Sequence, residues 1–396
     1  MPIRSWTAHP GRRRLVCLTN MPTPYRIHFY NTLARTLRGH RVALQVLFMS
    51  RTEPGRHWQL RGENWFFDYG FLPGIHPVAL DRQFHLNPTS LAKLALSPPA
   101  WLLLSGSWYM PTVYLSSCLS KLTRTTTLFW SESNLAYVEH RSALVEKLRE
   151  WVMDSFDGYA VPGAWAREYV LHYAPSASRK PMLSLPNVVD ERLFRDEVAR
   201  RRGRRQELLA KWHLGERHRP ILFASARLEP VKGIRELLLA LASMQARPVT
   251  FLVAGEGTLR AELEALIDEA ELKDQFGLLG FLGEPEILDL LSLADGFILP
   301  SLGDPYPLAV IEAAFAGLPL LLSDRVGCHP EALLPGENGL LFNPHDLESI
   351  RLCLAEFVGL GPKRWAEMGA RSLEVAEDRF GTEHVVARFV GELLQL

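Results

Sequence analysis

Two basic residues follow an apolar run near the middle of the chain. Residues 221–226 are typical of a buried strand, and Arg227 and Lys232 lie in the loop between that run and a helix expected over 234–244. Ligands bind beyond the carboxyl ends of parallel strands, and the first turn of a helix offers free N–H groups there. Two cations in such a loop suit a diphosphate. The other interpretation is a solvated, charged loop.

A second loop of this kind contains glycine. Residues 249–254 form another strand-like run, which ends in Gly255 and Gly257 before a helix expected over 259–270. Glycine lets a ligand approach the backbone closely. The complete G-x-G-x-x-G dinucleotide pattern is absent, so an ordinary turn is the alternative.

A third loop contains acids. A strand expected over 296–300 precedes Asp304, and Glu312 lies about two turns into a helix expected over 308–316. Both carboxylates can face one cleft and accept protons from sugar and ribose hydroxyls. The N–H groups near Leu308 and Ala309 would donate hydrogen bonds to the anionic oxygens of a phosphate that lies between those hydroxyls. The alternative is a helix-terminal acid and a solvated one.

The elements that position these loops alternate in type. Short apolar runs and helix-period segments follow one another throughout, which predicts α/β architecture with parallel sheets. The other expected strands are 15–19, 42–49, 101–105, 126–130, 158–161, 182–185, 276–279 and 319–323, and the other helices are 26–37, 143–155, 164–173 and 286–293. Segment 51–80 remains unassigned.

The 396 residues exceed what one hydrophobic core supports, so we expect two domains. They are 1–190, rejoined by a C-terminal helix over 376–396, and 191–375. Composition is that of a globular protein, with 47% hydrophobic and 22% charged residues. The four cysteines are scattered and no metal-ligand spacing occurs, which argues against a metal site or a disulfide framework and suits a reducing compartment such as the cytoplasm. No nucleic-acid partner is expected. No signal peptide or membrane span is expected.

Charge is unevenly distributed. Residues 1–190 contain 21 basic and 12 acidic side chains, whereas the remainder contains 23 and 32. With Arg4, Trp6, Arg12, Arg13 and Arg14 at the N-terminus, this predicts peripheral docking on the anionic inner face of the cytoplasmic membrane. A basic face for an acidic acceptor, or merely uneven solvated faces, are the alternatives.

The order and spacing of several segments are similar to those of one enzyme family. The segments are ASARLEPVKG, VAGEGTLRAELEAL, LGFLG, LADGFILPSLGDPYPLAVIEAAFAGLPLLLSD and PGENGLLF. The C-terminal half resembles the retaining GT-B glycosyltransferases of family 4, the glycosyl transferases group 1. This resemblance implies two facing, doubly wound Rossmann-like domains with the active site in the interdomain cleft. It also implies transfer of a hexose from a nucleoside diphosphate sugar to a hydroxyl of a lipid-linked or oligosaccharide acceptor, as in bacterial polysaccharide, lipopolysaccharide or glycolipid biosynthesis, without a required metal.

The resemblance assigns roles to the donor-side residues. Arg227 and Lys232 would hold the diphosphate and neutralise the leaving group, Asp304 would touch the transferred sugar, and Glu312 would bind the ribose. Further donor contacts are implied for Gly255, Gly257, Tyr306, Leu308 and Ala309, and the backbone at Phe281 and Leu282 would border the nucleobase. Asp304 stands where Glu is usual, and Tyr306-Pro307 stands where Phe-Gly is usual.

The N-terminal half resembles the family only loosely. Thr23, Pro24, Tyr25 and Arg26 occupy the loop where a glycine pair is expected and are assigned to the acceptor side. Glu132 is a catalytic candidate, since it lies with Trp130 near the point where many relatives have a histidine. Trp108 is an acceptor-side candidate, with a core tryptophan as the alternative.

His28, His76 and His85 are expected at the surface or as caps. Two other functions are compatible with the sequence. They are a nucleotide-sugar epimerase of the same architecture and an inactive nucleotide-sugar-binding partner subunit.

Overall fold

The chain forms two compact units. The structure, a computed structural model, describes residues 13–53, 64–79, 82–137, 142–215, 220–245 and 249–396. Unit 1 comprises Met1–Val188 and Thr382–Leu396, and unit 2 comprises Val189–Gly381. Unit 1 therefore contains both ends of the chain, and unit 2 is a continuous segment.

A parallel sheet is the centre of unit 1. In the described part of the chain it has seven strands in the order β3-β2-β1-β6-β7-β8-β9. The strands are β1 (Arg14–Thr19), β2 (Ala43–Phe48), β3 (Asp68–Phe71), β6 (Trp101–Ser105), β7 (Thr126–Trp130), β8 (Gly158–Val161) and β9 (Met182–Ser184). A short antiparallel hairpin, β4 (Val78–Ala79) with β5 (Arg82–Gln83), interrupts the connection after β3.

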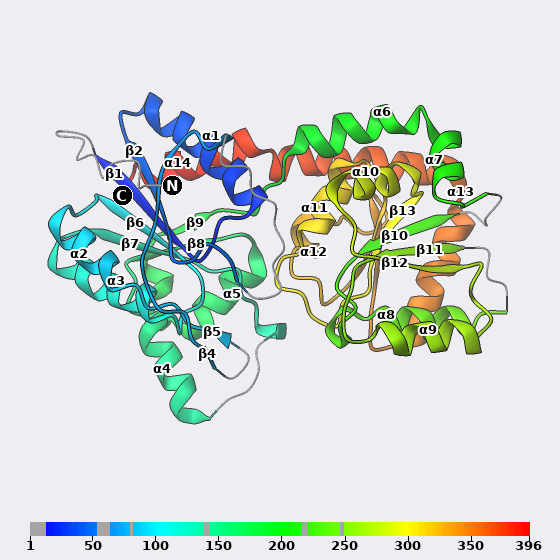
Figure 1. Ribbon diagram of the computed structural model, residues 1–396, viewed down its shortest axis with the longest axis horizontal. Coiled ribbons are helices and arrows are strands. Elements are labelled where there is room, and N and C mark those ends of the chain that lie inside the picture. The colour runs from blue at the N-terminus through cyan, green and yellow to red at the C-terminus, as the bar shows by residue number, and fades with distance from the viewer. Residues whose placement is uncertain (1–12, 54–63, 80–81, 138–141, 216–219, 246–248) are drawn as a thin grey trace. The chain divides into compact units, whose positions relative to one another are not determined.

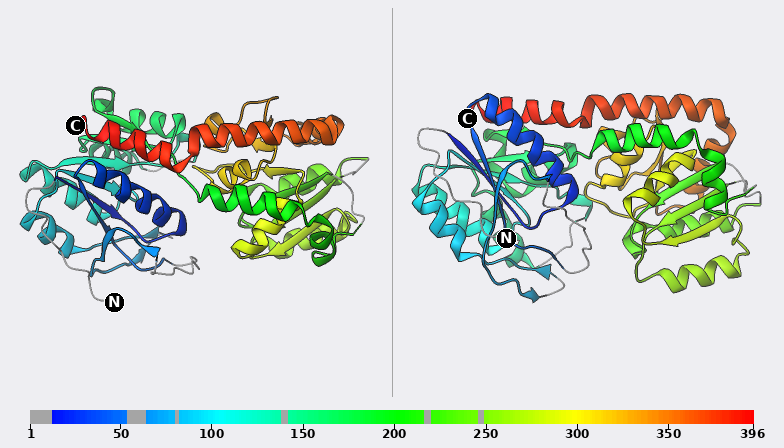
Figure 2. Two further views of the ribbon diagram at one scale, coloured as in Figure 1. Left: turned by 90° about the horizontal axis from the view of Figure 1, so that it is seen from above. Right: turned by 45° about the horizontal axis from the view of Figure 1, so that its top comes forward.

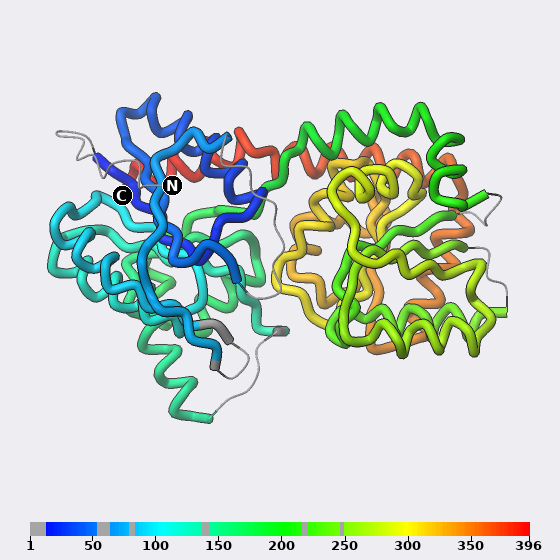
Figure 3. The backbone as a smooth tube through the Cα atoms, in the orientation of Figure 1, coloured from blue at the N-terminus to red at the C-terminus, as the bar shows by residue number. Residues whose placement is uncertain are grey.

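Helices lie on both faces of this sheet (Figures 1 and 2). They are α1 (Pro24–Gly39), α2 (Pro88–Leu96), α3 (Pro111–Leu122), α4 (Ala143–Met153), α5 (Ala164–Tyr173) and α14 (Thr382–Leu393). Proline occupies the first turn of α1, α2 and α3, where its missing N–H costs no hydrogen bond. The last helix, α14, packs against α1 and β9. Figure 3 shows α14 in red beside α1 in blue.

Unit 2 repeats this design. Its described residues form a six-stranded parallel sheet in the order β12-β11-β10-β13-β14-β15. The strands are β10 (Ile221–Ser225), β11 (Thr250–Ala254), β12 (Phe276–Gly280), β13 (Gly296–Leu299), β14 (Leu320–Ser323) and β15 (Gly339–Phe342). The helices are α6 (Val198–Arg202), α7 (Arg205–Lys211), α8 (Ile234–Ala242), α9 (Arg260–Glu269), α10 (Glu284–Leu293), α11 (Leu308–Phe315), α12 (His329–Ala332) and α13 (Leu347–Phe380). Helix α13 is broken at Gly361, which has a φ of 75° and precedes Pro362.

Alternating side chains build a hydrophobic core on each face of both sheets. In β10, Phe223 packs into one core and Leu222 and Ala224 pack into the other. In β1, Cys17 packs into the core on one face of the sheet and Val16 into the core on the other. Strands buried on both faces read as continuous apolar runs, which is why the sequence predicts them as parallel strands.

The strand order creates a defined ligand position in each sheet. Relabelled in chain order, the six strands of unit 2 follow 3-2-1-4-5-6, the order of the Rossmann fold. The order reverses between β10 and β13, and in sheets of this kind ligands bind beyond the strand ends at such a reversal. In unit 1 the corresponding reversal lies between β1 and β6. The α/β class with two Rossmann-like sheets is confirmed.

The structure contains elements that the sequence pattern does not predict. They are α2, α3, α12, the long α13, the hairpin, and strands β3 and β15. Residues 376–380 belong to α13, and the helix that packs on unit 1 begins at Thr382. Among the described residues, no helix is both long enough and apolar enough to span a membrane.

Candidate functional site

The loops after β10, β11 and β13 are tied together by backbone contacts. The N–H of Leu228 donates to Glu256 O at 3.0 Å, and the N–H of Leu302 donates to Val231 O at 2.8 Å. The hydroxyl of Thr258 donates to the Glu229 carboxylate at 2.7 Å. The three loops that the sequence marks as basic, glycine-rich and acidic therefore form one surface at the carboxyl edge of the sheet.

Glycine is required where these loops meet. A Cβ on Gly255 would lie 1.9 Å from Ala226 O, and its φ of 149° disfavours any side chain. A Cβ on Gly257 would lie 2.3 Å from Leu228 O. Contact with the neighbouring loop therefore explains both glycines before any ligand is considered. Their contact with a donor stays a prediction.

The structure joins two of the predicted site residues. Lys232 Nζ forms an ion pair with Asp304 Oδ2, and only 16% and 9% of their side-chain surfaces are exposed. Asp304 is held by its backbone, since its N–H donates to Arg325 O at 3.2 Å and its carbonyl accepts from Gly327 N at 2.8 Å. A cation and a carboxylate are thus fixed at the reversal between β10 and β13.

Other positive groups lie in the same two loops as this pair. Arg227 is exposed and forms no ion pair with the residues that the structure describes. Helix α11 begins just after Pro307, and the N–H groups of Leu308 and Ala309 have no partner within the helix, because they lie in its first turn. Tyr306, in contrast, is buried in the core with 7% exposure. Its ring therefore serves packing in this structure.

Glu312 lies on α11 and is half-buried. Burial, followed by repulsion from Glu284 at the start of α10, raises the pKa of Glu312 to about 7. Glu284 is not among the site residues expected from the sequence. It occurs four residues after Gly280 at the end of β12, and only the sheet order brings it near α11.

The two residues assigned to the nucleobase lie in the loop after β12 and differ in exposure. Phe281 is 70% exposed, whereas Leu282 is half-buried and packs against the core. Gly280, with a φ of 76°, precedes them and accepts a hydrogen bond from Gly255 N at 2.8 Å. An exposed aromatic ring thus stands next to the glycine-rich loop.

In unit 1 the structure brings together Arg26 and Glu132. Their side chains form an ion pair, and the Arg26 guanidinium lies 3.4 Å from the centre of the Trp130 ring. Burial would lower the pKa of Arg26, but Glu132, with Tyr25 and Tyr30, outweighs burial and raises it. Arg26 is 5% exposed and Trp130 2% exposed, so both lie in the interior.

The remaining acceptor-side candidates differ in exposure. Thr23 is buried and precedes α1, whereas Pro24 is exposed and Tyr25 half-buried. Trp108 is half-buried, with its ring centre 5.8 Å from that of Tyr109 and 5.2 Å from the guanidinium of Arg149.

Two expectations about charged groups need correction. His85 is not at the surface, since its exposure is 0%. Arg14 is not a surface cation, since it is 8% exposed and donates to Ser97 Oγ at 2.9 Å. Arg13 stacks 3.9 Å from the centre of the Trp101 ring. Arg4, Trp6 and Arg12 lie outside the described residues.

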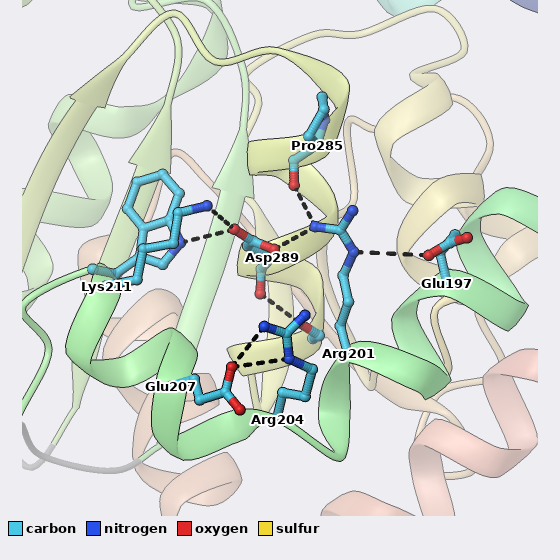
Figure 4. A network of polar contacts seen from close by, with 9 residues as sticks. Glu197, Arg201, Arg204, Glu207, Lys211, Pro285 and Asp289 are labelled. Atoms are coloured by element: carbon cyan, nitrogen blue, oxygen red, sulfur yellow. Dashed lines mark hydrogen bonds and ion pairs between the residues drawn. The ribbon is translucent and has the colours of Figure 1, made fainter.

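A separate charged network holds the helices that open unit 2 (Figure 4). A hollow of about 330 Å³ is lined by Glu197, Arg200, Arg201, Arg204, Leu208, Lys211 and Asp289. Burial would raise the pKa of Asp289, but hydrogen bonds from Lys211 and Arg201 lower it. Because the buried carboxylate is compensated by two cations, we assign the network to joining α6 and α7 to α10. In the part of the chain that the structure describes, no group of three His, Cys, Asp or Glu side chains is arranged to hold a metal ion.

Known proteins share sequence and fold with this chain. Residues 207–369 match the sequence profile of the glycosyl transferases group 1. The chain is 26% identical, over 63% of its length, to 65% of the 2-deoxystreptamine glucosyltransferase of Streptomyces kanamyceticus. It is 29% identical, over 45% of its length, to 45% of the amylovoran biosynthesis glycosyltransferase AmsK of Erwinia amylovora. The chain thus spans less than two thirds of the length of these curated relatives.

The fold comparison covers nearly the whole chain. The crystal structure of Anabaena HepE in complex with UDP superposes with a TM-score of 0.74 at 15% identity, over 97% of this chain and 100% of that one. At such identity the likeness shows the fold alone, which is the GT-B fold of glycosyltransferases. Residues 207–369 are therefore similar in sequence to the glycosyl transferases group 1, within a chain of GT-B fold.

Proposed function

We propose that the chain transfers a sugar from a nucleoside diphosphate sugar to an acceptor hydroxyl, with retention of anomeric configuration. The observation that carries this proposal is the ion pair of Lys232 and Asp304 at the strand reversal of unit 2, with the exposed Arg227 in the same loop as Lys232. The proposal is supported by the match to group 1 and by the complexes of HepE with UDP and with UDP-glucose.

The chemistry follows from where charge develops. The bond between the anomeric carbon and the β-phosphate oxygen breaks, and the bond to the acceptor oxygen forms on the same face. The leaving phosphate takes the acceptor proton. Arg227, Lys232 and the N–H groups of Leu308 and Ala309 face the charge that grows on the diphosphate, and fixed donors of this kind lower such a barrier.

Each acid has its own task in this proposal. Glu312 accepts hydrogen bonds from the ribose, and Asp304 accepts them from the transferred sugar. Gly255 and Gly257 let the donor approach the backbone, and the base lies at Phe281 and Leu282. Arg227 and Lys232 supply the positive charge, so the reaction needs no metal ion.

The acceptor side is assigned to unit 1. We propose a lipid-linked or oligosaccharide acceptor in bacterial polysaccharide assembly, supported by the similarity to the amylovoran biosynthesis enzyme. The 21 basic against 12 acidic residues of 1–190 favour an anionic membrane surface. Co-sedimentation with vesicles containing phosphatidylglycerol, at low and at high salt, tests this location. Absence of binding at low salt contradicts it.

Donor turnover tests the activity itself. The purified protein is incubated with UDP-glucose, UDP-galactose or GDP-mannose, with and without octyl glycosides, and with EDTA. We expect release of the nucleoside diphosphate from one donor, transfer in the presence of EDTA, and a product whose anomeric proton coupling matches that of the donor. Absence of both turnover and nucleotide binding refutes the function, and an inverted product refutes retention.

A further inference from the structure

A carboxylate and two imidazoles form a chain in unit 1. Glu53 Oε1 lies 3.2 Å from His85 Nε2, and His85 Nδ1 lies 2.9 Å from His76 Nδ1. His85 is fully buried, whereas His76 is half-buried. The chain therefore runs from a carboxylate through an interior ring to a ring that reaches the surface.

The hydrogen bonds determine which nitrogen holds each proton. An ionised carboxylate only accepts hydrogen bonds, so His85 Nε2 carries a proton and donates it to Glu53. When the His85 ring holds only this proton, its Nδ1 accepts, and His76 donates from its own Nδ1. This leaves His76 Nε2 as an acceptor in the neutral ring. Burial and the neighbouring His85 lower the pKa of His76, which favours that neutral form.

Contacts from several loops fix this chain at the ligand edge of the sheet. Asn20, directly after β1, donates to Glu53 at 2.7 Å. Thr112 Oγ1, at the start of α3, donates to the carbonyl of His85 at 2.8 Å. The ring centre of Phe84 lies 5.3 Å from that of Tyr109, in the loop after β6. The loops after β1, β2 and β6 thus meet around His85, next to the strand reversal of unit 1.

We propose that His76 Nε2 accepts a hydrogen bond from a hydroxyl of the acceptor sugar, with His85 and Glu53 as positioning residues. This inference rests on the proposed glycosyl transfer and deepens it by naming an acceptor subsite. The half-buried rings of Trp108 and Tyr109 on the adjoining loop suit the faces of a sugar ring. The groups that bind the donor diphosphate belong to unit 2, so this site serves the other substrate.

The first test separates the acceptor from the donor. His76→Ala should raise the KM for an octyl glycoside acceptor about tenfold, the effect of losing one neutral hydrogen bond. UDP affinity and donor KM should stay unchanged, and His76→Gln should recover part of the loss. Glu53→Gln keeps the size of the side chain and should shift the acceptor KM in the same direction. The control His40→Ala changes an exposed histidine beyond the end of α1. An acceptor KM in His76→Ala within twofold of wild type overturns the inference.

A second measurement does not depend on turnover. Saturation-transfer NMR compares binding of octyl glucoside and octyl galactoside to wild type and His76→Ala, while calorimetry measures UDP binding to both. Weaker glycoside binding in His76→Ala with unchanged UDP binding supports the subsite. Equal glycoside binding in the two proteins, or none to wild type, overturns it. Loss of the proposed function is recognised separately, by absence of donor turnover and of UDP binding in wild type.

Discussion

Lys232 and Asp304 neutralise each other across the loops that follow β10 and β13. The cation assigned to the donor diphosphate is therefore paired, in the free protein, with the carboxylate assigned to the transferred sugar. A diphosphate that binds Lys232 has to compete with Asp304. The pair holds the lysine in place before the donor arrives. Because the two side chains carry opposite charges, substitutions at Lys232 and Asp304 should have opposite effects on diphosphate binding.

Lys232→Ala should lower kcat/KM by about 100-fold to 1,000-fold, because it removes the charge that we assign to stabilising the leaving diphosphate. Asp304→Asn should instead raise UDP affinity by up to about tenfold, since it frees Lys232, and should lower transfer. Calorimetry with UDP and steady-state kinetics measure both effects. Asp268→Asn, which removes an exposed ion pair with Lys273, is the control. A loss of UDP affinity in Asp304→Asn contradicts the competition.

Glu132→Gln should destabilise unit 1, because it leaves the interior Arg26 without its compensating charge. Breaking a buried ion pair from one side costs about 3–5 kcal/mol, and the partial exposure of Glu132 reduces the expectation to about 2 kcal/mol. Urea unfolding at pH 7 measures it, and the double variant Arg26→Met with Glu132→Gln should recover stability. The control is Glu383→Gln, which breaks the exposed pair with Arg35. If Glu132→Gln and wild type have the same urea midpoint of unfolding, this structural role is contradicted.

The parallel strands and the loops assigned to the donor were predictable from the sequence. Strand Gly158–Val161 and helix Ala164–Tyr173 have the expected bounds, because apolar runs buried on both faces and helical periodicity are local signals. The loops of Arg227 and Asp304 were expected to converge, since the carboxyl ends of parallel strands share one edge. From this shared edge the sequence indicates only that Lys232 and Asp304 are near each other. Their side-chain contact is seen only in the structure.

Other parts depend on distant contacts that leave no local pattern. Strand Asp68–Phe71 contains Asp and Gly and is defined by pairing with β2, so its own sequence favours no strand. Helix α13 is obscured by Gly361 and Pro362, which normally end a helix. Glu53 and His85 are 32 residues apart and meet only through the sheet order, so their relation to His76 had no signal in the spacing.

Glu312→Gln should stabilise the protein at high pH and not at low pH. The pKa of Glu312 is raised from 4.5 to about 7 in the folded state, so the unfolded chain loses this proton first. Ionisation therefore lowers stability as pH rises from 4.5 to 7, and the full cost, on the order of 2–3 kcal/mol, is present above pH 7. Urea unfolding of the variant and wild type at pH 4 and pH 8 measures it. The control Glu269→Gln changes an exposed glutamate of α9. A stability gain of equal size at both pH values rules out titration of Glu312 as the cause.

Gly233→Ala should destabilise unit 2 and displace Lys232. Gly233 follows Lys232, has a φ of 68°, and a Cβ there would lie 1.9 Å from Pro300 O. Because both the backbone conformation and a rigid carbonyl oppose a side chain, we expect a cost of about 3 kcal/mol or more.

Two matched substitutions separate these causes. Gly336→Ala has a φ of 80° but nothing within 4 Å, and Gly359→Ala in α13 has neither obstacle. Gly336→Ala should lower the free energy of unfolding by about 1 kcal/mol, and Gly359→Ala should raise it by up to about 1 kcal/mol. If urea unfolding places Gly233→Ala level with Gly336→Ala, the contact with Pro300 does not constrain this loop. If Gly233→Ala also keeps wild-type UDP affinity, the position of Lys232 does not depend on the turn that Gly233 forms.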